Sequence, residues 1–172
     1  MRWRRKGKHG NIMRIVFLCI TLFIFFDASG QSIEKYKIEQ LVERINKAGD
    51  TVLIVNFWAT WCKPCIEELP FFHTMAGKYR DKKVKLLLVS IDFEKDYPDG
   101  IIAFSRKEGY DSEIVFLDET DADHFCPQVD KSWSGAIPST LITSNANEYR
   151  KFTEGKIKPA ELETFILQAV GK

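Results

Sequence analysis

Two cysteines separated by two residues follow directly on an apolar run in this chain. The run at 53–58 predicts a strand that is buried on both faces, and the residues after Cys65 predict a helix. Cys62 is therefore expected at a strand-to-helix turn, where free backbone N–H groups and the helix dipole stabilise a thiolate. Such a thiolate attacks disulfides, and Cys65, one turn later, resolves the mixed disulfide that forms. The pair predicts a redox couple at the start of a helix.

The N-terminal thirty residues have the layout of a secretory signal. Six basic side chains precede the twelve-residue apolar run at 15–26, and Ala28-Ser29-Gly30 supplies small residues for cleavage. We expect residues 1–30 to be a signal peptide, with Met13 as an alternative start, and residues 31–172 to form one domain. The run is short for a spanning helix, which needs about 20 residues. We therefore expect it to direct export to the periplasm, with a membrane tether if the segment is left uncleaved.

Removal of that segment changes the charge and the cysteine count. The remaining 142 residues carry 19 basic and 23 acidic side chains, so the net charge moves from +1 to −4, and nothing favours nucleic acid as a partner. Three cysteines remain, which excludes a disulfide scaffold. The third, Cys126, is expected to be an inert buried thiol. A metal site joining it and His124 to the close pair is not expected.

Helical and strand patterns alternate along the chain and predict an α/β sandwich with a mixed central sheet flanked by helices. The acidic stretch 118–134 is expected to be an irregular connection. The last two strands flank Asn145-Ala146-Asn147 and are expected to form a hairpin. The predicted helices span 33–48, 62–79, 101–107 and 159–170, and the predicted strands span 51–57, 84–91, 114–117, 138–143 and 149–153.

Two motifs resemble the exported TlpA/ResA-like branch of the thioredoxin superfamily. The first is residues 55–65 (VNFWATWCKPC) followed by 68–70 (ELP), and the second is residues 136–140 (AIPST), which resembles the family's loop with a cis-proline. The resemblance covers about residues 33–170. It implies a thioredoxin-like three-layer sandwich in which the second motif faces the cysteines.

The resemblance also implies roles for the residues around the pair. Cys62 matches the attacking cysteine and Cys65 the resolving cysteine. Lys63 and Pro64 match the variable pair that helps to set the potential, and Trp61 matches an aromatic shelf that contacts the substrate.

The second motif is expected to bind the client chain. Pro138 matches the cis-proline, whose ring donates no hydrogen bond, so the backbone of Ile137 is left to pair with an extended peptide. Trp133, shortly before the loop, either lines the substrate groove or packs beneath the loop.

Two polar residues distinguish the chain from cytoplasmic thioredoxins. Asn56 stands where those proteins carry a buried aspartate. Glu68 matches the carboxylate of the exported branch, three positions after Cys65, and is expected to hold or release the proton of Cys65. The alternative for Glu68, a solvated place on the helix surface, stays open.

These residues predict an exported thiol-disulfide oxidoreductase. We expect it to be a monomer that reduces disulfides of client proteins, cytochrome c maturation being one such role, and to be recharged by an upstream thiol electron donor. No cofactor is expected beyond the couple itself. A thiol peroxidase is the first alternative, although its threonine would stand three positions before the cysteine and Thr60 stands two before Cys62. The second is a haem-, copper- or protein-binding module without turnover.

Overall fold

The computed structural model describes residues 32–171, so the predicted signal peptide lies outside the described residues. Within the described range, six strands form one sheet in the order β1-β4-β3-β2-β5-β6. The first four strands in this order pair in parallel, whereas β5 pairs antiparallel with both β2 and β6. The sheet is therefore mixed, as predicted. The strands are β1 (Glu34–Tyr36), β2 (Val52–Trp58), β3 (Val84–Ser90), β4 (Glu113–Leu117), β5 (Ser139–Ser144) and β6 (Tyr149–Glu154).

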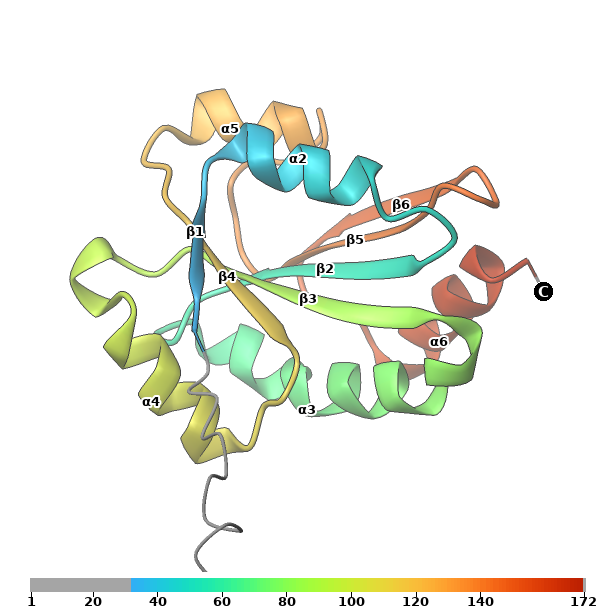
Figure 1. Cartoon of the computed structure of the whole chain (residues 1–172), viewed down its shortest axis with the longest axis horizontal. Coiled ribbons are helices and arrows are strands. Elements are labelled where there is room, and N and C mark those ends of the chain that lie inside the picture. The colour runs from blue at the N-terminus through green and yellow to red at the C-terminus, as the bar shows by residue number, and fades with distance from the viewer. Residues whose placement is uncertain (1–31, 172) are drawn as a thin grey trace, which may run out of the picture. The chain divides into compact units, whose positions relative to one another are not determined.

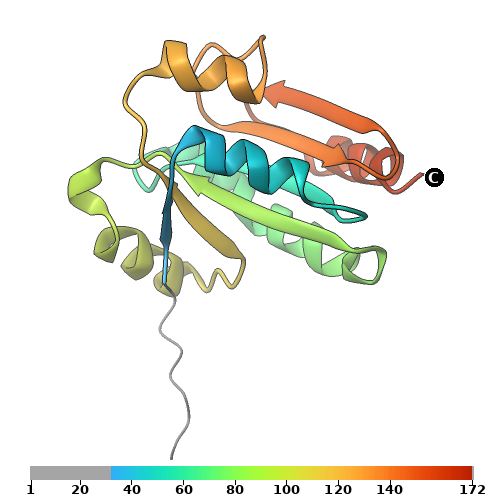
Figure 2. The ribbon, with the colours of Figure 1, turned by 45° about the horizontal axis from the view of Figure 1, so that its top comes forward.

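Helices cover both faces of the sheet and complete three layers. In Figures 1 and 2, α3, α4 and α6 lie on one face, and α2 and α5 lie on the other. No helix within residues 32–171 has the length and apolar character to cross a membrane. The α-helices are α2 (Ile38–Asn46), α3 (Lys63–Lys78), α4 (Asp99–Glu108), α5 (Ala122–Val129) and α6 (Pro159–Ala169), with 3-10 turns at Arg80–Lys82 and Glu94–Asp96.

Strand β2 runs through the centre of the core. All of its residues are buried, which is what its unbroken apolar sequence predicts for a strand with helices on both faces. Alternate side chains point to opposite layers. Ile54 and Trp58 belong to the cluster beneath α3 and α6, whereas Val55 and Phe57 belong to the cluster beneath α2 and α5.

Two segments differ from their predicted structure. The helix predicted at 33–48 is wrong in its first turn, because Glu34–Tyr36 pairs with the open edge of β4 as a short parallel strand. The backbone hydrogen bonds that this edge offers outweigh the helical spacing of the side chains. The helix itself begins only at Ile38.

The irregular connection predicted at 118–134 contains the helix α5. Its acidic residues mark the start of a helix, since the Asp121 carboxylate accepts a hydrogen bond from the His124 N–H at 3.2 Å. Phe125 and Val129, one turn apart, turn inward and are buried. The capping acid was mistaken for part of a solvated loop.

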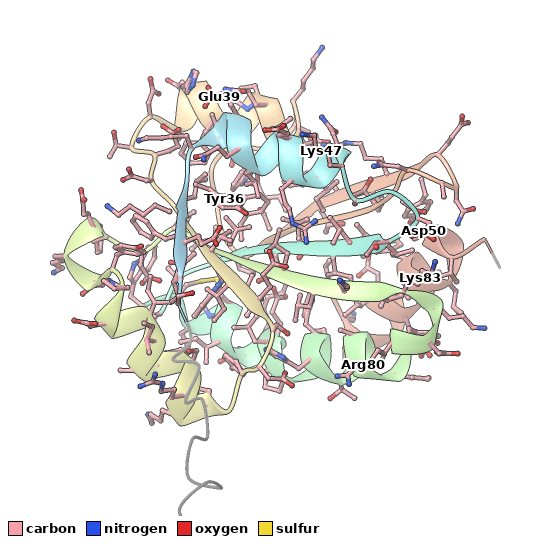
Figure 3. The ribbon with its side chains drawn as sticks, in the orientation of Figure 1. Tyr36, Glu39, Lys47, Asp50, Arg80 and Lys83 are labelled. Atoms are coloured by element: carbon pink, nitrogen blue, oxygen red, sulfur yellow. A yellow bond between two sulfur atoms is a disulfide. The ribbon has the colours of Figure 1, made fainter. Side chains whose placement is uncertain are left out.

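The strand directions bring three loops together at one end of the sheet. β2 and β3 are parallel and finish there, and the antiparallel β5 starts there (Figure 1). The turn after Trp58, the loop after Ser90 and the loop before Ser139 are therefore neighbours. At the opposite end of these strands, Asp50 and Lys83 form an ion pair, seen side by side in Figure 3.

Candidate active site

Cys62 and Cys65 form a disulfide at the start of α3, with 5.3 Å between their Cα atoms. Cys62 is the N-cap of the helix, and its sulfur accepts a hydrogen bond from the Cys65 N–H at 3.3 Å. The two cysteines differ in exposure: Cys62 is 5% exposed and Cys65 is fully buried. Cys62 is less exposed than we expected for an attacking cysteine. Another disulfide can nevertheless approach from its exposed side.

The residues between and before the cysteines lie at the surface. Lys63 and Pro64 are exposed in the first turn of α3. Trp61 is 54% exposed, and its ring stacks on Phe93 with 5.8 Å between centroids. Phe93 was missed from the sequence because it stands in a polar, turn-rich segment where a single aromatic residue gives no signal.

The loop before β5 contains the cis peptide bond between Ile137 and Pro138 that the resemblance implied. Ser139 pairs with Phe57 across the β2–β5 ladder, which brings Pro138 level with Trp58, close to the cysteine turn. Across residues 32–171, the N–H and C=O of Ile137 have no hydrogen-bond partner. A second cis bond, between Tyr97 and Pro98, had no predicted counterpart.

Trp133 packs beneath this loop, which favours the second of the two places that the sequence left open for it over a place in the substrate groove. The residue is 5% exposed, and its indole N–H donates to the Ala136 carbonyl at 2.9 Å. Its ring contacts an aromatic cluster made of Phe57, Phe125 and Phe152. Trp133 therefore supports the loop from inside the core.

Glu68 is a buried carboxyl group that accepts hydrogen bonds from two other parts of the chain. The Asn56 side-chain N–H donates to Glu68 Oε1 at 3.0 Å and is also 3.0 Å from Thr140 Oγ1. The Ile157 N–H donates to Glu68 Oε2 at 3.2 Å. Because Glu68 and Asn56 are both fully buried, the solvated alternative for Glu68 is excluded.

Burial raises the pKa of Glu68 from an ordinary 4.5 to about 7, because a carboxylate loses its hydration inside the protein. The hydrogen bonds from Asn56 and Ile157 and the charge of Lys156 oppose this increase only in part. Near neutral pH the group therefore takes up and releases a proton. It does so on the helix that carries Cys65, one turn away.

The raised pKa of Glu68 predicts a pH-dependent stability. An unfolded chain ionises this carboxyl near pH 4.5, whereas the folded chain keeps the proton until about pH 7, so the free energy of unfolding falls as the pH rises through this window. The decrease is expected to be about 3 kcal/mol at most. Urea unfolding of the oxidised protein at pH 5 and pH 8 measures it, and Glu68→Gln is expected to remove it.

The exposed neighbour Glu67 provides the matched control. It pairs with Lys156 at 2.7 Å, and this contact lowers its pKa, so Glu67→Gln leaves the decrease between pH 5 and pH 8 in place. A Glu68→Gln protein with the wild-type pH dependence would contradict the assignment.

Cys126 is separated from the redox pair by the sheet. It is a buried free thiol on α5, in the core cluster on the other face from Cys62 and Cys65. Burial raises its pKa to about 11, and the charges of Glu154 and Asp123 add to this effect. In the part of the chain that the structure describes, no three His, Cys, Asp or Glu side chains are grouped to hold a metal ion.

Known proteins resemble this chain in sequence. The ResA thiol-disulfide oxidoreductase of Oceanobacillus iheyensis is 24% identical over 155 residues, which cover 80% of this chain and 70% of that protein. The protein of the same name from Geobacillus kaustophilus is 27% identical over 112 residues, which cover 64% of this chain and 59% of that protein. These similarities confirm the ResA-like resemblance.

Solved structures confirm the fold. StoA from Bacillus subtilis aligns with a TM-score of 0.51 and 21% identity, over 69% of this chain and 84% of that one. A thioredoxin-related protein from Neisseria meningitidis serogroup B aligns with a TM-score of 0.57 and 23% identity, over 73% of this chain and 87% of that one. The fold class is therefore α/β and thioredoxin-like, as predicted.

The cysteine pair gives this fold a dithiol–disulfide couple, which is the chemistry of a thiol-disulfide oxidoreductase. The AhpC/TSA family matches residues 23–147, which make up well over half of this chain. The chain therefore belongs to the AhpC/TSA family.

Proposed function

We propose that this chain reduces disulfides in exported client proteins through the Cys62–Cys65 couple. The observation that carries the proposal is the unequal exposure of the two cysteines at the start of α3. A client disulfide reaches Cys62, and Cys65 waits behind it out of contact with solvent. The name thiol-disulfide oxidoreductase, carried by ResA relatives from two organisms, supports the same reading.

The reaction proceeds by two exchanges. The Cys62 thiolate attacks one sulfur of the client disulfide, that S–S bond breaks, and the first client cysteine leaves as a thiolate and takes a proton. The Cys65 thiolate then attacks Cys62, forms the intramolecular disulfide and releases the second client cysteine. Two electrons pass to the client, and a dithiol donor of the same chemical class must return them.

Glu68 is proposed to manage the proton of Cys65. The second exchange needs Cys65 as a thiolate, and a base with a pKa of about 7 can accept its proton near neutral pH and return it in the reverse direction. Asn56 and the Ile157 N–H hold the carboxyl group in place.

The loop at Pro138 is proposed to align the client. The unpaired backbone of Ile137 offers one N–H and one C=O to an extended peptide, as an added strand would use them. Hydrogen bonds between the client backbone and Ile137 form beside the cysteine turn. They therefore favour clients whose cysteine lies in an extended segment.

The surroundings of the reaction are part of the proposal. Residues 1–30 read as an export signal, so we place the enzyme in the periplasm, as a monomer that receives electrons from a thiol donor at the membrane. Cytochrome c maturation, in which cysteine thiols must be kept reduced for haem attachment, is one fitting client pathway.

Removal of the resolving cysteine is expected to trap the client. Reduced Cys65→Ala protein mixed with insulin should accumulate a covalent adduct through Cys62, because no second thiol is present to release it. Non-reducing electrophoresis measures the adduct, which should disappear on addition of dithiothreitol.

The double variant Cys62→Ala/Cys65→Ala is the matched control and should form no adduct. Absence of any adduct, together with absence of insulin reduction by the wild type, would overturn the proposed function. Turnover of hydrogen peroxide in place of insulin would indicate a thiol peroxidase. A measured reduction potential near the oxidising end, about −120 mV, would reverse the proposed direction of electron flow.

A further inference from the structure

The chain between the last strand and the last helix joins two parts of the active site. Residues 154–157, here called the linking segment, start at the end of β6 and lead towards α6 (Figure 1). The first two residues of the segment contact the Pro138 loop (residues 134–138), and the last two contact α3. A turn that only connects a strand with a helix needs no such contacts, so their order points to a further role.

The first half of the linking segment is fixed to the Pro138 loop. The Glu154 carboxylate accepts hydrogen bonds from both the N–H and the hydroxyl of Ser134, each at 2.7 Å. The Gly155 N–H donates to the Pro138 carbonyl at 2.8 Å, which extends the β5–β6 ladder by one bond. Hydrogen bonds to an ionised acceptor are stronger than those between neutral groups, so Glu154 ties the segment to the loop.

The second half of the linking segment lies against α3. The Ile157 N–H donates to Glu68 Oε2 at 3.2 Å, and the Ile157 side chain is 2% exposed. Lys156 pairs with Glu67 at 2.7 Å, but both side chains are about half exposed, so this ion pair contributes little to holding the segment. The place of the Ile157 N–H is therefore set by its own buried side chain and by the contacts of the two residues at the start of the segment.

Gly155 lets the chain turn from the Pro138 loop to α3 within two residues. Its φ is 94°, in the left-handed region that residues with a Cβ rarely adopt. A Cβ added to Gly155 would meet no atom within 4 Å beyond its chain neighbours. A side chain at this position therefore disturbs the backbone conformation without a steric clash.

The Ile157 N–H acts on the charge state of Glu68. It stabilises the carboxylate, as the Asn56 side chain does, and both oppose the rise in pKa that burial causes. In the part of the chain that the structure describes, Lys156 is the charged group whose field acts on Glu68. Cys65, on the same helix, does not titrate while it is in the disulfide. A displacement of the Ile157 N–H is therefore expected to change the proton affinity of Glu68.

We infer that the linking segment is a positioning element: its hold on the Pro138 loop keeps the Ile157 N–H on Glu68 and so sets how readily this carboxyl group gives up its proton. The inference rests on the proposed function, in which Glu68 manages a cysteine proton, and deepens it by assigning Glu154 and Gly155 as positioning residues. Both act through Ile157. The loop that aligns the client and the base that serves the resolving cysteine are thus tied together by four consecutive residues.

Titration of the Glu68 carboxyl group in the oxidised protein, without client, tests the inference. Carbon NMR of protein labelled at glutamate follows its resonance, which is identified by its absence from Glu68→Gln. Gly155→Ala is expected to raise the pKa of Glu68 by about one pH unit, because the carboxylate loses a hydrogen-bond donor.

Gly109→Ala is the matched control for this titration. Gly109 ends α4 with a φ of 73°, and a Cβ added there would also meet no atom within 4 Å beyond its chain neighbours. The substitution therefore imposes the same kind of backbone strain outside the linking segment. The pKa of Glu68 in Gly109→Ala is expected to stay at about 7.

Glu154→Ala is a second variant, and it decides the test alone if Gly155→Ala does not fold. Loss of the carboxylate frees the segment from Ser134 and is expected to raise the pKa of Glu68. A direct effect of the removed negative charge would lower that pKa instead, so the sign separates the two causes. Glu154→Gln keeps an oxygen that accepts from Ser134 and is expected to restore most of the wild-type pKa.

Insulin reduction over the same pH range connects the titration with turnover. At pH 7 the activity of Gly155→Ala is expected to be about fivefold below that of the wild type, since a smaller fraction of Glu68 is ionised. The two activities are expected to converge by about pH 9, where Glu68 is ionised in both proteins. A loss of activity that came only from damaged packing would be the same at every pH.

The outcomes separate this inference from the proposed function. A folded Gly155→Ala protein with the wild-type pKa of Glu68 would overturn the inference, even with full insulin reduction. A fall of this pKa in Glu154→Ala, or an equal rise in Gly109→Ala, would overturn it as well. If the pKa rises as expected but insulin is not reduced by the wild type, or the pH profile does not follow the pKa, the result counts against the proposed function alone.

Discussion

Cys62→Ser is expected to reduce the insulin-reducing activity of this protein to the uncatalysed level. A serine hydroxyl stays protonated at neutral pH and forms no mixed disulfide, so both exchanges are lost with this one atom. Cys65 cannot take over the attack because it is fully buried, whereas Cys62 opens to solvent. The turbidity that develops as insulin chains separate in dithiothreitol measures the activity.

Cys126→Ser is the matched control for this experiment. It makes the same substitution in a thiol that lies in the opposite core cluster, and burial holds the pKa of that thiol at about 11. The activity of Cys126→Ser is expected to equal that of the wild type. Residual thiol-dependent turnover in Cys62→Ser, or its loss in Cys126→Ser, would show that the reactive sulfur has been misplaced.

Trp133→Ala is expected to lower the free energy of unfolding by about 3–5 kcal/mol, the usual cost of emptying a large aromatic site in a core. The indole packs against Phe57 with 4.4 Å between ring centroids and donates to the Ala136 carbonyl. Removal leaves a cavity under the Pro138 loop and a carbonyl with one fewer donor. Urea unfolding of the oxidised protein measures the change.

Trp133→Phe distinguishes packing from direct contact with the client. It keeps most of the ring volume and loses the hydrogen bond, so an intermediate loss of stability is expected. If Trp133→Ala were as stable as the wild type and only the KM for clients rose, Trp133 would line the groove after all.

The sequence predicted those parts of the fold whose local pattern and tertiary setting agree. β2 is apolar throughout because both of its faces are covered, and the hairpin of β5 and β6 carries its own turn residues. The short β1 could not be predicted, since its strand state depends on the free edge of β4, 81 residues away at the pairing of Glu34 with Val115. Helix α5 was missed because its N-cap acid resembles a loop residue.

The residues of the candidate site also divide into those that the sequence identified and those that only the fold brings together. Spacing after a buried strand identified Cys62 and Cys65, and the resemblance of residues 136–140 to the family's cis-proline loop identified Pro138. The buried carboxyl group of Glu68 is held by Asn56 and Ile157, and Asn56 in turn donates to Thr140; no local pattern indicates this arrangement. Phe93 became visible only when the neighbouring strand brought it against Trp61.

The position of Cys126 on the far side of the sheet allows the redox state of the couple to be measured by alkylation. Because the sheet separates Cys126 from the couple, Cys126 stays a thiol whether Cys62 and Cys65 are joined or free. Within residues 32–171, alkylation in denaturant therefore adds one group to the oxidised chain and three to the reduced chain. The difference of two adducts reports the two electrons that the couple holds.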